Sequence, residues 1–106
     1  MANSLGDELS EALTNITSLI INTESKSERT KLTRQQAKIA GQLQVFVDKM
    51  VDEALPEYRA ATAALNAANA EAKAAKKDLD KTAATIKKYA GAIDKLGKLA
   101  KKVATA

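Results

Sequence analysis

Residues 63–77 read "AALNAANAEAKAAKK", a stretch made almost wholly of alanine, asparagine and lysine. On its own it looks like a basic, low-complexity tail. In a heptad register with Tyr58 at position a, however, it belongs to a pattern in which positions a and d carry no charge through to Val103. Position a holds Tyr58, Leu65, Ala72, Leu79, Ile86, Ile93 and Ala100, and position d holds Ala61, Ala68, Ala75, Thr82, Tyr89, Leu96 and Val103. The register predicts one long C-terminal helix over about 57–104, which would span roughly 70 Å at 1.5 Å per residue.

The residues beside this a/d seam predict contact with more than one helix. Positions e and g include Asn69, Ala83, Ala92 and Gly97, whereas a two-stranded coiled coil usually carries Glu and Lys there. Small side chains let another backbone approach closely and widen the contact face. The larger seam residues are therefore the candidate interface, either within the chain or with a partner: Leu65, Leu79, Ile86, Tyr89, Ile93, Leu96 and Val103.

The first half of the chain also has helical periodicity. Apolar residues recur every three or four positions from Leu5 to Ile20, which predicts a helix over about 4–22 with Asn3 or Ser4 as its N-cap. A second apolar stripe predicts another helix over about 30–55. Residues 22–33 between them are rich in Ser, Thr and Asn, so they favour a joint. Because no Gly or Pro interrupts them, one continuous helix is the alternative.

Pro56 is the only proline in the chain. Inside a helix it would cost about 3 kcal/mol, whereas it is well tolerated as the first residue of a helix. A corner and a kink both fit the sequence, and we favour the corner because the two arms that it separates are nearly equal in length. The predicted fold is a single all-α domain spanning 1–106. It is either an elongated antiparallel helical hairpin or a three-helix bundle, with coiled-coil character.

The composition excludes much of catalytic chemistry. The chain contains no cysteine and no histidine, so thiolate metal sites, cysteine nucleophiles and imidazole bases are ruled out. We therefore expect no enzymatic activity and no cofactor or metal. The start of the chain carries acidic residues where a signal peptide needs basic ones, and no long apolar run follows. This predicts a cytoplasmic protein, with signal-independent export left open.

The charge is distributed unevenly along the chain. Residues 1–56 carry a net charge of −2 and residues 57–106 a net charge of +6. In the heptad register the lysines of the C-terminal segment fall mainly at b, c and f, on the side opposite the seam. Six of them form a candidate anion-binding face: Lys87, Lys88, Lys95, Lys98, Lys101 and Lys102.

Two functions are consistent with these patterns. The first is a structural or interaction protein that associates with itself, or with a helical partner protein, through the seam. The alternative is an accessory protein that binds nucleic acid or an anionic membrane surface through the lysine face, with an affinity that falls as salt rises.

Overall fold

The computed structural model describes residues 4–48 and 51–104. Four α-helices and one short 3₁₀ turn account for most of these residues, and none of them is in a strand. The elements are α1 (Leu5–Asn22), α2 (Lys26–Asp48), α3 (Pro56–Lys77), η1 (Leu79–Lys81) and α4 (Thr82–Ala104). The prediction of an all-α helical bundle is thus confirmed, with four helices in place of two or three.

The joint between α1 and α2 is a true break. Of the two N-cap candidates, Asn3 and Ser4, it is Ser4 that caps α1, in a capping box with Asp7, and the helix ends where Thr23 takes an extended conformation. Ser25 then accepts the backbone N–H of Glu28 at 3.3 Å, so α2 begins at Lys26. This start lies four residues before the predicted one. The predicted end at 55 is too late, since residues 51–55 are not helical, while residues 49–50 lie outside the described part of the chain.

Pro56 forms the corner that its position favoured. Leu55 is extended and Pro56 is the first residue of α3, where its missing N–H costs no helical hydrogen bond.

The predicted continuous helix over 57–104 is wrong. It ends at Lys77, because Asp78 adopts an extended conformation with φ −142° and ψ 96°. The Asp78 carboxylate accepts the N–H of Asp80 at 3.1 Å and caps the single 3₁₀ turn that leads into α4. The molecule consequently measures 43 × 27 × 17 Å, and the expected length of about 70 Å is not reached.

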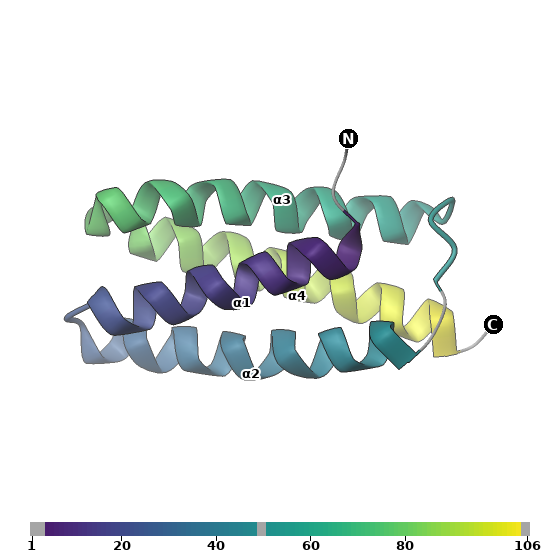
Figure 1. Ribbon diagram of the computed structural model, residues 1–106, viewed down its shortest axis with the longest axis horizontal. Helices are drawn as coiled ribbons and strands as arrows, with labels where there is room; N and C mark the ends of the chain where they lie inside the picture. The colour runs from purple at the N-terminus through teal and green to yellow at the C-terminus, as the bar shows by residue number, and fades with distance from the viewer. Residues whose placement is uncertain (1–3, 49–50, 105–106) are drawn as a thin grey trace.

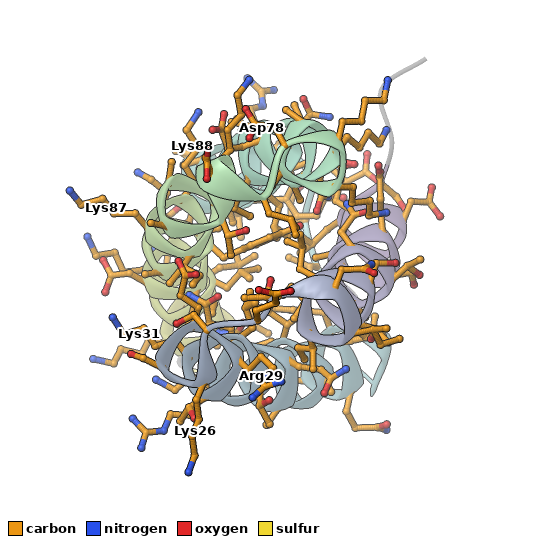
Figure 2. The ribbon with its side chains drawn as sticks, turned by 90° about the vertical axis from the view of Figure 1, so that its left-hand side faces the viewer. Lys26, Arg29, Lys31, Asp78, Lys87 and Lys88 are labelled. Carbon is orange, nitrogen blue, oxygen red and sulfur yellow. The ribbon has the colours of Figure 1, made fainter. Side chains whose placement is uncertain are left out.

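The helices form two antiparallel hairpins, α1–α2 and α3–α4, that pack against each other (Figure 1). α1 lies parallel to α3, and α2 lies parallel to α4. Viewed along the bundle, the four helices occupy the corners of a square, with α1 diagonally across from α4 (Figure 2). The α2–α3 connection therefore crosses the end of the bundle diagonally. As a result α2 packs against α4, although the two helices are far apart in the sequence.

The core lies between the two hairpins. It is built from leucine, isoleucine and alanine with a single tyrosine: Leu5, Leu9, Ala12, Ile16, Leu19, Leu32, Ile39, Ala61, Leu65, Ala68, Ala72, Ala75, Tyr89, Ala92, Leu96 and Leu99. The buried alanines of α3 pack against neighbouring helices. Ala92 of α4 is buried in the same way, as its small size at position g predicted. Gly97 differs, since a Cβ added there would meet nothing within 4 Å.

Candidate anion-binding face

The fold divides the predicted seam into buried and exposed parts. Leu65, Tyr89 and Leu96 are fully buried among the helices of the same chain. Ile86, Ile93 and Val103 are partly buried and pack against the core, whereas Leu79 lies in the turn and is 41% exposed. Because the chain reverses at Asp78, the two halves of the seam face the interior of one bundle.

The six candidate lysines of α4 are all exposed, and their b, c and f positions lie on the side of the helix away from the core. Lys88 pairs with Glu71 of α3 across 3.6 Å, and Lys95 and Lys102 follow at seven-residue intervals on the same side of the helix. Lys87 points outward, away from the bundle (Figure 2). Lys101 is two heptads further on, and Lys98 lies 3.8 Å from Asp94 of the same helix. The lysines of α4 therefore extend from the side of the helix next to α3, where Lys88 pairs with Glu71, out to its solvent side.

Two glutamines show how α2 lies against α4. Gln35 Nε2 donates to the backbone carbonyl of Ile86 at 2.8 Å, and Gln42 Nε2 donates to the carbonyl of Ile93 at 3.3 Å. Both glutamines and both isoleucines are seven residues apart, which fits two parallel helices in register. Each carbonyl is also the acceptor of the ordinary helical hydrogen bond from the N–H four residues later in α4.

This packing adds the basic residues of α2 to the lysine row of α4. Figure 2 shows Lys31 of α2 and Lys87 of α4 projecting from the same side of the bundle. Lys38 stands one turn before Gln42, as Lys31 does before Gln35, so it borders α4 as well. We call the surface formed by Lys31, Arg34, Lys38, Lys87 and Lys101 the α2–α4 face.

The acidic side chains lie mainly elsewhere. α1 contains Asp7, Glu8 and Glu11 and no basic residue. Glu11 pairs with Lys73 of α3 at 2.7 Å, and the hydrogen bond and charge of Glu11 raise the pKa of Lys73. By contrast, the ion pairs within residues 4–48 and 51–104 involve none of the five basic side chains of α2: Lys26, Arg29, Lys31, Arg34 and Lys38.

A cluster of hydrogen-bonded polar side chains is enclosed in the core. Asn69 Oδ1 accepts from Tyr89 Oη at 2.6 Å and from Asn15 Nδ2 at 3.5 Å, and Asn69 Nδ2 donates to the carbonyl of Glu8 at 3.0 Å. Lys76 Nζ donates to Asn15 Oδ1 at 2.6 Å. Burial raises the pKa of the Tyr89 phenol well above its usual value, so the hydroxyl remains a neutral donor. These contacts join α1, α3 and α4 and fix how they pack.

The sequence pattern predicted candidate anion-binding residues on α4 alone and did not indicate the neighbouring basic residues of α2. Arg29 falls in the predicted joint over 22–33 and Arg34 in the predicted helix over about 30–55, and the pattern does not indicate which helix lies beside them. The seven-residue spacing of Gln35 and Gln42 is the sequence feature that corresponds to this contact. It places two polar residues on the same side of α2, at the edge of its apolar stripe.

The site and fold define a small, basic-faced four-helix bundle. Comparisons with protein-family models, with curated proteins and with solved structures gave no match. Across the described ranges, no helix combines the length and the apolar character needed to cross a membrane, and no group of three acidic side chains is arranged to hold a metal ion.

Proposed function

We propose that this chain is a non-enzymatic binding protein that holds an extended polyanion on the α2–α4 face. The observation that carries the proposal is the parallel packing of α2 on α4. It brings eleven basic residues onto two neighbouring helices that contain three acidic ones. Ligand phosphates or sulfates that replaced counterions along such a surface would bind with strong salt dependence.

The length of the face suits a polymer. Each of the two helices has 23 residues, which corresponds to about 34 Å of helix. Basic side chains recur over most of the length of α4 and over about the first half of α2. A ligand with regularly spaced negative charges can therefore contact several lysines at once, whereas a single small anion can contact only one or two.

Charge reversal tests this proposal against a matched control. In the face variant, Lys31, Lys38 and Lys87 are replaced by Glu. In the control variant, Arg59, Lys77 and Lys81 are replaced by Glu, so both proteins have the same net charge. All six side chains are exposed. We expect the face variant to bind heparin at least about tenfold more weakly than the control at about 50 mM salt. Equal losses in both variants would contradict a defined face.

Self-association through one end of the bundle is a second proposal, and it rests on two exposed apolar side chains, of which Leu79 belongs to the predicted seam. Ile21 is 75% exposed and Leu79 41% exposed, and both lie at the end of the bundle where α1 joins α2 and α3 joins α4 (Figure 1). An oligomer that used this end would dissociate in a Leu79→Asp variant, which leaves the core intact. Light scattering coupled to chromatography measures the mass, and a monomeric wild type would contradict this second proposal.

A further inference from the structure

The first half of α2 carries the densest cluster of basic side chains without intramolecular ion pairs in the described part of the chain. Lys26, Arg29, Lys31 and Arg34 are all exposed within nine residues. Figure 2 shows three of them fanning out from α2: Lys31 toward the α4 side, Lys26 outward, and Arg29 toward the α1 side. The cluster therefore covers a wide arc of one helix.

The surface of this segment is a ridge between two shallow hollows. Lys26, Thr30 and Arg34 recur at four-residue spacing and line both hollows, so they form the ridge. The hollow on the α1 side has a volume of about 400 Å³ and is also lined by Ile20, Arg29 and Thr33.

The hollow on the α4 side has a similar volume of about 400 Å³, and Ser27 and Lys31 complete its lining. The hydroxyls of Thr30 and Thr33 donate to backbone carbonyls one turn earlier. The charged groups and the Ser27 hydroxyl are therefore the available donors in the hollows, and each hollow has a basic side chain of its own.

The neighbouring helices do not oppose an anion here. The half of α1 that adjoins Arg29, residues 13–22, contains no charged residue, and the acidic residues of α1 lie in its first half. On the other flank, α4 contributes Lys87. The acidic residues nearest to the ridge are Glu24 in the joint and Glu28 in the first turn of α2, so the four basic side chains of the cluster outnumber them.

The aromatic residues argue against a single-stranded ligand. Tyr89 is fully buried, and Phe46 and Tyr58 are partly buried and packed against the core. Proteins that bind single strands stack bases on exposed aromatic rings, and the described surface lacks such a platform.

We propose, building on the proposed polyanion-binding function, that the first half of α2 lies in the major groove of double-stranded DNA. The major groove of B-form DNA is wide enough for an α-helix, whereas the major groove of double-stranded RNA is too deep and narrow. The Lys26–Thr30–Arg34 ridge enters the groove. Arg29 contacts the phosphates of one strand, and Lys31 contacts those of the other together with Lys87. Phosphate contacts of this kind position the protein with little sequence preference.

The test compares labelled DNA duplex, RNA duplex and single-stranded DNA, each of about 20 nucleotides per strand, by fluorescence anisotropy at about 50 mM salt. We expect the DNA duplex to bind at least about tenfold more tightly than either of the others. The double variant Arg29→Ala/Lys31→Ala should lose at least about tenfold in affinity for the DNA duplex. Its plot of log affinity against log salt should also become shallower by about 1.8, the effect of two lost phosphate contacts.

Arg59→Ala is the control, because Arg59 is an exposed arginine on α3, diagonally across the bundle from α2. Circular dichroism establishes that all variants keep their helical content. Equal binding of DNA and RNA duplexes, equal binding of single strands, or equal losses in the double variant and in Arg59→Ala would overturn the groove model. If heparin still binds through the α2–α4 face in that case, the proposed function stands. If no polyanion binds, both fail.

Discussion

Asn69 connects three helices through one side chain. It accepts hydrogen bonds from Tyr89 and Asn15 and donates to the carbonyl of Glu8, and it is 2% exposed. Its position e in the heptad predicted only a small residue that permits close packing. The pattern could not show that its amide meets a tyrosine from α4, because that contact depends on the reversal at Asp78. Burial of these groups is favourable only while each retains its partner.

Replacement of Asn69 by Ala should therefore be costly. Tyr89 Oη and the carbonyl of Glu8 would lose their partners in a dry core, and we expect the free energy of unfolding to fall by about 2–4 kcal/mol. Tyr89→Phe removes only one hydrogen bond and should cost about 1 kcal/mol. Urea denaturation measures both variants. A cost for Asn69→Ala no larger than that for Tyr89→Phe would show that the amide does not organise the core.

Tyr89 also predicts a pH dependence. Because burial raises the folded-state pKa of Tyr89 above its value of about 10 in the unfolded chain, the folded state retains the phenolic proton longer than the unfolded state does. The resulting stability is fully present below pH 10 and is lost as the pH rises above it. The unfolding free energy of the wild type should therefore fall more steeply between about pH 10 and 11 than that of Tyr89→Phe, which shares the same lysines. Parallel curves for the two proteins would contradict this origin.

At the scale of the helices, the sequence predicted the periodic segments and the caps well but not the break at Asp78. Ser4 and Pro56 act as their local chemistry indicates. Residues 77–82 contain no Gly or Pro, and the heptad register runs through them without interruption. The break is stabilised by tertiary packing, since a continuous helix would leave Leu65 and Leu96 without the neighbours that they acquire when α4 folds back on α3.

The glycines inside α2 and α4 are a local weakness of these helices. A Cβ added at Gly41, Gly91 or Gly97 would meet nothing within 4 Å. Because glycine in a helix interior costs up to about 1 kcal/mol relative to alanine, each Gly→Ala variant should gain about 0.5–1 kcal/mol.

Thermal unfolding provides the measurement for these variants. A gain of 1 kcal/mol in a domain of this size raises the Tm by roughly 4–8 °C. Ala37→Gly, at an exposed position of α2, is the matched reverse change and should lower the Tm by a similar amount. A fall in Tm for the Gly→Ala variants would mean that another helix or molecule occupies the space beside these glycines.

At the scale of the whole molecule, the arrangement of the two hairpins determines the charge distribution. The sequence showed that the second half of the chain is basic, but it also indicated that the first half is acidic overall. The structure places the acidic residues of the first half mainly on α1 and near the α2–α3 connection, and it turns the basic first half of α2 toward α4. A net charge counted along the chain cannot show this, because the two helices are adjacent only in space.

The most direct test of the account is the distance between α2 and α4 in solution. Cysteine is absent from the chain, so Lys38→Cys and Ala90→Cys provide the only two sites for spin labels. Lys38 precedes Gln42 by one turn, and Ala90 follows Ile86 by one turn, which places both on the contact between the helices. If α2 and α4 are packed against each other as the structure shows, the labels at residues 38 and 90 should be about 10–20 Å apart. A hairpin with one continuous helix after Pro56 would pair residue 38 with residue 74 and displace residue 90 by about 24 Å along the axis. A separation well above about 25 Å would therefore contradict the four-helix arrangement, and with it the α2–α4 face.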